Sequence, residues 1–224
     1  MKKFKSIAID GPAGAGKSDI SSILAEKLGF VHIDTGALYR AISLCFLGKK
    51  LDKQTIDSVL SSANVDVKFE NGNQLVYLNG ENVTNRLRNA QISKLASDVS
   101  SFKEVREFLL NLQRNIAKSN NVIMDGRDIS TVVLPNADVK IFLTASAEER
   151  AKRRYKQLKG SQNELGYDEI LKSIKSRDYN DMNRDIAPLR PAEDSLIYDT
   201  TNYDIDEVVN YILNYIKEKI DVYL

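Results

Sequence analysis

Residues 11–18 read Gly11-Pro12-Ala13-Gly14-Ala15-Gly16-Lys17-Ser18, which matches the phosphate-binding pattern G-x-x-x-x-G-K-S/T in full. A short apolar run at 4–10 precedes the motif and an amphipathic pattern at 18–28 follows it. The motif therefore lies between a predicted strand and a predicted helix. Its glycines let backbone N–H groups turn inward toward phosphate oxygens, and the helix N-terminus adds its unpaired N–H groups. This stretch predicts a P-loop that binds a nucleoside triphosphate.

Polar side chains within and beside the motif have separate expected roles. Lys17 would reach the β- and γ-phosphates, and the Ser18 hydroxyl would bind Mg²⁺. Asp10 and Asp34 each end a predicted strand, so either could contact Mg²⁺ through water, and either could instead cap a helix or a turn. We favour Asp34 as the water-mediated magnesium contact because it lies outside the carboxyl edge of the sheet, where ligands bind in α/β folds.

Strand and helix patterns alternate along most of the chain. After strand 30–34 and a helix at about 36–47, residues 65–83 alternate apolar with polar and contain Asn71-Gly72 and Asn79-Gly80, which predicts small antiparallel hairpins. We expect further helices at 104–117, 147–158, 168–183 and 205–216, and strands at 122–124, 139–143 and 196–198. This order predicts an α/β fold: a P-loop three-layer sandwich with a parallel central sheet, a small antiparallel β insertion and a helical lid.

Length and composition are those of one ordinary domain. The 224 residues are 42% apolar and 28% charged, and we expect a single domain over 1–224, with a core at 1–60, 85–145 and 190–224, the β insertion at about 61–84 and the lid region at about 146–189. A net charge of +1 indicates neither a nucleic-acid nor a membrane partner. One cysteine, Cys45, excludes an internal disulfide, and no signal peptide or membrane span is expected, so we predict a cytoplasmic monomer.

Arginines recur at helical spacing in two charged segments. Arg150, Arg153 and Arg154 share one face of the first segment, and Arg177 and Arg184 share a face of the second. Like charges at this spacing repel unless a polyanion lies between them, and guanidinium groups suit phosphoryl oxygens. Beside a P-loop, the set favours a lid that closes over the transferring phosphates, with 159–166 as its hinge region. The alternative is a solvated face with salt bridges, whose candidate partners are Glu148, Glu149 and Asp178.

Several stretches resemble the bacterial cytidylate kinase family. Together they span about residues 6 to 200 in the family's order, and their combination is specific where the P-loop alone is generic. They are Asp34-Thr35-Gly36-Ala37-Leu38-Tyr39-Arg40, Ser97-Asp98-Val99 with Val105-Arg106, Met124-Asp125-Gly126-Arg127-Asp128 with Thr131-Val132-Val133 and Pro135, Glu148-Glu149-Arg150-Ala151-Lys152-Arg153-Arg154, and Arg177 and Asp181 followed by Arg184-Asp185 and Ala187-Pro188-Leu189.

The resemblance implies that ATP, with Mg²⁺, phosphorylates CMP or dCMP to the diphosphate. It assigns catalysis to Lys17, Arg127 and Arg177 and adds Arg154 to the ATP site. For the acceptor, it implies that Arg40 and Arg127 hold the phosphate and that Arg177 joins them on lid closure. The remaining implied contacts are Ser97, Arg106 and Asp128 at the cytosine edge, Asp181 at the ribose hydroxyls, Arg184 among the phosphates, Thr35 with its usual hydroxyl, and Tyr39, which would either stack near the acceptor or simply pack.

Two positions depart from the family pattern. Ser130 stands where the family usually has glycine, which would cost strain if the backbone there needs a positive φ. Asp19 stands where threonine is common and adds negative charge near the phosphates, although a carboxylate at a helix N-terminus is locally favourable. His32, the sole histidine, is expected to be structural because an acceptor phosphate oxygen needs no histidine base.

Two other functions remain open on the residues themselves. One is another small-molecule P-loop kinase that acts on a metabolite hydroxyl, for which Asp34 could serve as the base. The other is a P-loop ATP-binding regulatory module without acceptor chemistry. The guanine-specific pattern N-K-x-D does not occur, which argues against a GTPase switch.

Overall fold

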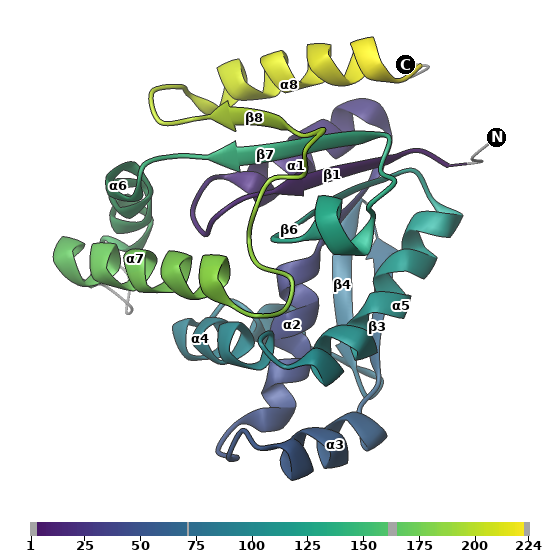
Figure 1. Ribbon diagram of the computed structural model, residues 1–224, viewed down its shortest axis with the longest axis vertical. Helices are drawn as coiled ribbons and strands as arrows, with labels where there is room; N and C mark the ends of the chain where they lie inside the picture. The colour runs from purple at the N-terminus through teal and green to yellow at the C-terminus, as the bar shows by residue number, and fades with distance from the viewer. Residues whose placement is uncertain (1–3, 71, 161–164, 222–224) are drawn as a thin grey trace.

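A five-stranded parallel sheet forms the centre of the molecule (Figure 1). The computed structural model describes residues 4–70, 72–160 and 165–221. The sheet order is β2-β6-β1-β7-β8, which places the strand before the P-loop in the middle. The strands are β1 (Ser6–Asp10), β2 (Val31–Asp34), β6 (Val122–Gly126), β7 (Val139–Thr144) and β8 (Leu196–Asp199).

Alternate side chains of the central strands enter two different helical layers. Ile7 and Ile9 pack against α1 (Lys17–Leu28) and α8 (Ile205–Lys219) on one face. Ala8 packs on the other face with Met124, next to α5 (Lys103–Ser119) and the π-helical turn η3 (Ile129–Val133). All residues of β1 and β6 are buried, as expected for unbroken apolar strands covered on both sides. The predicted three-layer α/β sandwich is confirmed.

The antiparallel insertion forms a second sheet in the order β3-β4-β5. It consists of β3 (Val65–Glu70), β4 (Asn73–Leu78) and β5 (Glu81–Asn82). Asn79 and Gly80 connect β4 to β5 with φ values of 51° and 84°, the two-residue geometry that an Asn-Gly pair favours. In the first predicted turn, residue 71 lies outside the described residues. The hairpin prediction is confirmed, and the sheet packs with α2 (Thr35–Ser43) in its own apolar cluster.

Several helical segments were not predicted. Asp52 caps α3 by accepting from the Thr55 N–H, and Asn89 caps α4 by accepting from the Gln91 N–H, so both helices carried an N-cap signal in the sequence. The predicted helix 36–47 ends earlier than expected, since its last turn is a separate 3₁₀ segment. That last turn is η1 (Leu44–Phe46). The segments without a prediction include α3 (Lys53–Ser62), α4 (Ala90–Val99) and the 3₁₀ turn η2 (Thr84–Arg86).

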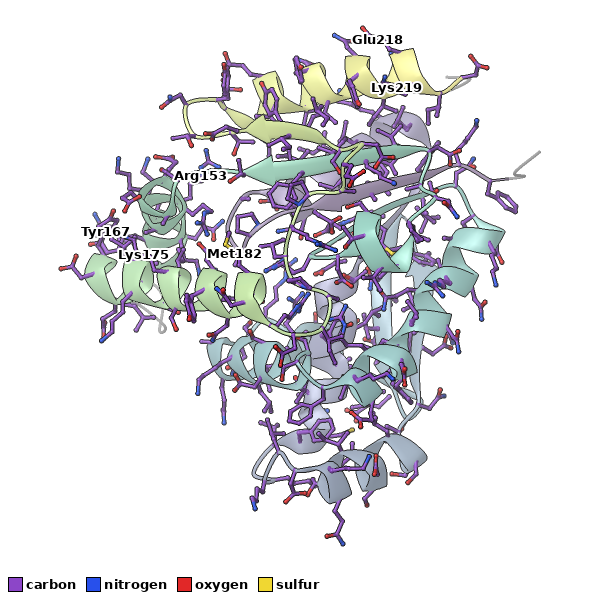
Figure 2. All side chains as sticks on the ribbon, in the orientation of Figure 1. Arg153, Tyr167, Lys175, Met182, Glu218 and Lys219 are labelled. Carbon is purple, nitrogen blue, oxygen red and sulfur yellow. The ribbon has the colours of Figure 1, made fainter. Side chains whose placement is uncertain are left out.

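The helices α6 (Ala147–Leu158) and α7 (Tyr167–Asn183) stand beyond the carboxyl ends of the strands, at the left of Figure 1. Although both segments are rich in charged residues, Ala151, Ile170 and Ile174 form a small buried cluster that joins the pair. Tyr167 and Lys175 lie along this pair in Figure 2, and Lys175 also bonds Glu148 at 2.9 Å. Of the predicted hinge region, 161–164 lies outside the described residues. Among the described helices, none is long and apolar enough to cross a membrane.

Gly11 fixes the first turn of the P-loop against β7. Its φ is +149°, and a Cβ atom there would lie 1.9 Å from the carbonyl oxygen of Leu143. Gly11→Ala should therefore destabilise the protein by about 3 kcal/mol or more, because backbone must move. Gly48→Ala is the control: its φ is also positive, but nothing lies within 4 Å, so about 1 kcal/mol is expected. Thermal unfolding followed by circular dichroism compares them, and equal losses would contradict the packing argument.

Candidate functional site

The P-loop joins the carboxyl end of β1 to the start of α1, as the sequence predicted. Lys17 is the first residue of α1, and its Nζ donates to the carbonyl oxygen of Pro12 at 2.8 Å. Arg150 donates to the carbonyl oxygen of Ala13 at 3.0 Å, so that α6 contacts the loop backbone. The loop and its lysine thus form a short cationic turn beside the lid helices.

The Lys17 amine is buried among other cations. Burial, followed by the charge of Arg127, lowers the pKa of Lys17 to about 7. Asp125 and Asp10 act in the opposite direction but do not compensate for these effects. An anion against Nζ would favour the charged form, so the electrostatics of this position favour an anionic ligand.

Asp125, at the end of β6, links the P-loop to β2. The Ser18 hydroxyl donates to its Oδ2 at 2.8 Å, and His32 Nε2 lies 2.7 Å from its Oδ1. The expected structural role of His32 agrees with this contact. The hydroxyl and carboxylate are hard oxygen donors, so they fit Mg²⁺, which takes one or two protein oxygens together with substrate phosphates and waters. The residues described include no cluster of three or more His, Cys, Asp or Glu side chains suited to a metal.

Asp34 and Asp10 are the two carboxylates considered for magnesium, and both accept hydrogen bonds from backbone N–H groups. Asp34 caps α2 by accepting from the Ala37 N–H at 3.0 Å, and it also pairs with Arg40 Nη2 at 2.5 Å. Asp10 is fully buried and accepts from the segment after β6. These are the capping and turn contacts that the sequence left open. A water-mediated contact of Asp34 with Mg²⁺ stays a prediction, and Asp125 is the carboxylate that sequence reasoning missed.

A chain of arginines and aspartates connects α5, the segment after β6 and α7. Arg106 of α5 pairs with Asp128, and Arg127 Nε donates to Asp181 of α7 at 2.9 Å. Arg184, at the end of α7, places its Nη2 3.6 Å from Asp128. The structure therefore brings together residues that are widely separated in the sequence and that were all predicted for the acceptor.

Guanidinium nitrogens in this cluster are incompletely satisfied. Within the described part of the chain, the buried atoms Arg40 Nε, Arg177 Nε and Arg184 Nη2 have no hydrogen-bond partner. Burial, together with the neighbouring Arg127, lowers the pKa of Arg177 to about 10. Burial would raise the pKa of Asp181, but Arg127 and Arg177 outweigh it and hold that pKa below its usual value. Unpaired buried donors are costly, so the cluster favours an anionic ligand.

Two of the three arginines of α6 are paired with carboxylates. Arg150 is 4% exposed and donates both terminal nitrogens to Asp178 at 3.0 and 2.5 Å. Arg153 pairs with Glu149 at 3.2 Å and donates to the Thr200 carbonyl oxygen at 2.6 Å, toward the end of β8 (Figure 2). These contacts fit the salt-bridge alternative, because Asp178 and Glu149 were two of its candidate partners. Arg154 is exposed and bonds Gln157 at 3.3 Å.

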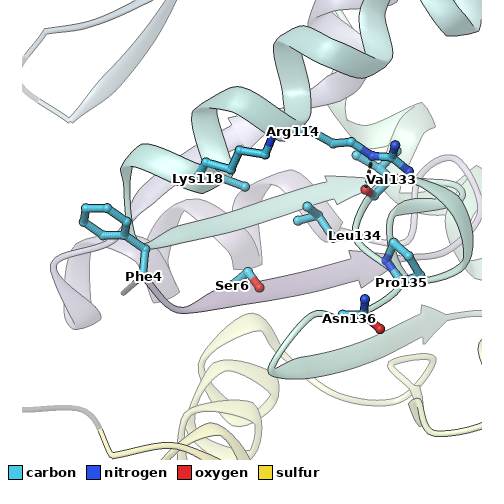
Figure 3. Close-up of a pocket in the computed structure, with 9 residues that line it drawn as sticks. Phe4, Ser6, Arg114, Lys118, Val133, Leu134, Pro135 and Asn136 are labelled. Carbon is cyan, nitrogen blue, oxygen red and sulfur yellow. Dashed lines mark hydrogen bonds between the residues drawn. The ribbon is translucent and has the colours of Figure 1, made fainter. Parts of the chain in front are cut away.

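A cavity of about 310 Å³ lies between α4 and α7 beside this cluster, lined among others by Ser97, Asp181 and Arg184. Ser97 thus faces the same space as two other predicted acceptor residues. A larger cavity of about 410 Å³ lies at the opposite end of β1, around Phe4 and Pro135 (Figure 3). It is remote from the P-loop, so we do not assign it to this site.

The remaining predicted residues border the cluster. Thr35 donates its hydroxyl to the Asp125 carbonyl oxygen at 2.8 Å. The centroid of the Tyr39 ring lies 5.7 Å from the Arg106 guanidinium carbon, and Tyr39 also packs against the apolar cluster of the β insertion. Asp19 is exposed in the first turn of α1. Ser130 does not have a positive φ, so the strain considered for this departure is absent.

Comparison with known sequences identifies the family. The sequence model described as Cytidylate kinase matches residues 7–218, nearly the whole chain. The chain belongs to the cytidylate kinase family. A cytidylate kinase from Caldicellulosiruptor saccharolyticus is 54% identical over 216 residues, 95% of each chain. One from Pasteurella multocida is 48% identical over 220 residues, 96% of each chain. The family is one of enzymes, and its substrates are nucleotides.

Solved structures of low sequence identity share the fold. An uncharacterized protein from Eubacterium ventriosum has a TM-score of 0.55 at 15% identity, covering 96% of this chain and 99% of its own. A shikimate kinase from Bacteroides thetaiotaomicron has a TM-score of 0.50 at 13% identity, covering 95% and 98%. At these identities the likeness concerns the fold alone.

Protonation of Lys17 should accompany triphosphate binding. At about pH 8, an amine of pKa about 7 is mostly neutral, whereas adjacent phosphates raise its pKa and charge it. ATP binding should then take up close to one proton per site, measured by titration calorimetry in buffers of different ionisation enthalpy. Lys17→Arg is the control, since arginine is charged before binding and takes up none. Equal proton uptake by both proteins would contradict the assignment.

Proposed function

We propose that this protein transfers the γ-phosphoryl group of ATP to CMP and dCMP, giving the corresponding diphosphates and ADP. Membership of the cytidylate kinase family supports the acceptor class. The observation that carries the proposal is the cluster of incompletely satisfied guanidinium groups beside Lys17. Phosphoryl transfer brings together two phosphate chains, and its catalysis rests on positioning and cationic stabilisation.

The acceptor phosphate would bind among Arg40, Arg127 and Arg177. Besides burial, the charges of Arg127 and Arg40 both lower the pKa of Arg177, so the three guanidinium groups lie near one another. An oxygen of the acceptor phosphate attacks the γ-phosphorus as the bond from the γ-phosphorus to the β–γ bridging oxygen breaks. The electron pair of that bond leaves with ADP. Lys17 and the guanidinium groups would stabilise the charge on the transferring group.

The cytosine edge would be read by the Arg106–Asp128 pair together with Ser97. Cytosine offers an N4 amino donor suited to the Asp128 carboxylate, and its O2 and N3 acceptors suit the guanidinium and the hydroxyl. Asp181 would bond the ribose hydroxyls, with Arg184 among the phosphates and Tyr39 and Thr35 bordering the acceptor. A site built from paired polar groups rejects a base that leaves them unpaired.

Mg²⁺ would be held by the Ser18 hydroxyl and by Asp125, directly or through water, with Asp34 as a water-mediated contact. When bound, it would neutralise charge on the triphosphate oxygens. The P-loop N–H groups would hold the triphosphate, and exposed Arg154 would extend over ATP on closure of the lid, 146–189. We propose that closure excludes water, which would otherwise compete as acceptor. The same proposal treats 1–60, 85–145 and 190–224 as the core and 61–84 as the insertion.

We further propose that the enzyme works as a cytoplasmic monomer on small nucleotides, without a nucleic-acid or membrane partner. The near-neutral net charge and the free cysteine, Cys45, support this. Light scattering coupled to gel filtration checks the monomer.

A coupled phosphotransfer assay over CMP, dCMP, UMP, AMP and GMP tests the acceptor. We expect CMP and dCMP to be used at least about tenfold better than purines, because purines leave the pocket's polar groups unpaired. Including shikimate and gluconate tests a metabolite hydroxyl as acceptor. ATP turnover independent of CMP, or equal rates with purines, would contradict the proposal. Lys17→Ala should abolish turnover.

Asp128→Ala should relax base choice more than it weakens ATP binding. Loss of the carboxylate removes the acceptor for the cytosine amino group and the ion-pair partner of Arg106. We expect the ratio of kcat/KM for CMP to that for UMP to fall about tenfold, with KM for ATP within about twofold. An unchanged CMP-to-UMP ratio would show that the proposed base contact is wrong.

A further inference from the structure

Asp10 is a buried carboxylate that contacts the acceptor side of the site although it lies directly before the P-loop. It accepts three hydrogen bonds from two consecutive residues: the Ile129 N–H at 2.8 Å, the Ser130 N–H at 2.7 Å and the Ser130 hydroxyl at 2.5 Å. Asp10 is 0% exposed and Ser130 is 2% exposed, so water does not substitute for these contacts. Burial raises the pKa of Asp10 to about 6, although these hydrogen bonds act to lower it.

The segment held by Asp10 carries the residues that contact the acceptor. Asp10 and Gly126 are register partners on β1 and β6, and Arg127 and Asp128 follow immediately. Asp128 N-caps η3, with irregular backbone angles of φ −146° and ψ 27°. No regular strand or helix therefore fixes the backbone at Arg127 and Asp128, and the Asp10 contacts begin at the next residue.

Arg114 of α5 holds the other end of the same segment. It donates to the carbonyl oxygen of Val133 at 3.0 Å (Figure 3). It also donates to the carbonyl oxygen of Val132 at 2.9 Å. The π-helical turn is thus fixed by a carboxylate at its start and a guanidinium at its end. Only the carboxylate belongs to the strand that leads into the P-loop.

We propose that Asp10 and Ser130 are positioning residues that set Arg127 and Asp128 relative to the P-loop and thereby control acceptor binding and base choice. The inference rests on the proposed function and deepens it. Asp10 touches neither phosphate chain in this arrangement and acts through the backbone of Ile129 and Ser130. Of the three hydrogen bonds to Asp10, the one from the Ser130 hydroxyl is the shortest. Removing this hydroxyl should loosen the segment while leaving the two N–H bonds in place.

Ser130→Ala tests the hydroxyl, with Ser21→Ala as the matched control. Ser21 is also fully buried and lies on α1, but its hydroxyl has no hydrogen-bond partner among the described residues. For Ser130→Ala we expect kcat/KM for CMP to fall about tenfold, the CMP-to-UMP ratio to fall with it, and KM for ATP to stay within about twofold. Ser21→Ala should leave all three unchanged.

Asp10→Asn and the double variant test whether the two residues act together. Adding Ser130→Ala to Asp10→Asn should reduce kcat/KM for CMP by no more than about twofold further, because both changes break the same contact. If Asp10→Asn does not fold, the Ser130→Ala and Ser21→Ala pair decides on its own.

The outcomes separate the two proposals. A wild-type protein that does not phosphorylate CMP would overturn the proposed function, and this inference with it. If the wild type is active on CMP, the inference alone falls when Ser130→Ala behaves like Ser21→Ala, or when KM for ATP and KM for CMP rise equally. Melting temperatures of all variants show whether a loss reflects unfolding.

Discussion

Concentrated positive charge without full compensation is the constraint on which the rest of the site depends. Lys17 and Arg177 are both buried beside Arg127, and each has its pKa lowered, by burial first and by that neighbour next. Water would normally screen such charges, but here packing excludes it. The folded protein therefore holds these basic groups in an environment that disfavours their charged forms, and a bound polyanion would relieve this cost. On the proposed function, the same property would favour phosphate before any base contact is considered.

The fold places these cations by bringing strand ends together. Parallel strands β1 and β6 end at the same edge of the sheet, so the P-loop and the Arg127–Asp128 segment meet there. Carboxylates hold the pieces in place, with Asp125 bonded to the P-loop helix and Asp178 bonded to Arg150, which also contacts the P-loop backbone. Helices α6 and α7 are thus joined to each other by an ion pair and an apolar cluster, and Arg150 connects the pair to the P-loop backbone.

Local patterns predicted much of the fold, and contacts distant in the sequence escaped prediction. The P-loop is one continuous motif with a strand before it and a helix after it, so its position followed from neighbouring residues. Asp125 and Asp10 could not be assigned in this way, because their partners Ser18 and Ser130 are more than 100 positions away. Arg150 is a different case. Asp178, 28 positions later, is its bidentate partner, and Asp178 was one of the three candidate carboxylates named for a salt-bridged face.

Most of the acceptor residues were assigned by resemblance to a family, and the structure adds which of them face one another. The roles proposed for these residues require that the phosphate supplies much of the binding free energy of the acceptor. The most direct measurement compares the affinities of CMP and cytidine by titration calorimetry in the presence of a non-transferable ATP analogue. The account predicts that cytidine, which lacks the phosphate, binds at least about a hundredfold more weakly than CMP, a difference of about 2.7 kcal/mol. Affinities within a few-fold of each other would contradict it, because the buried arginines would then have no part in holding the acceptor.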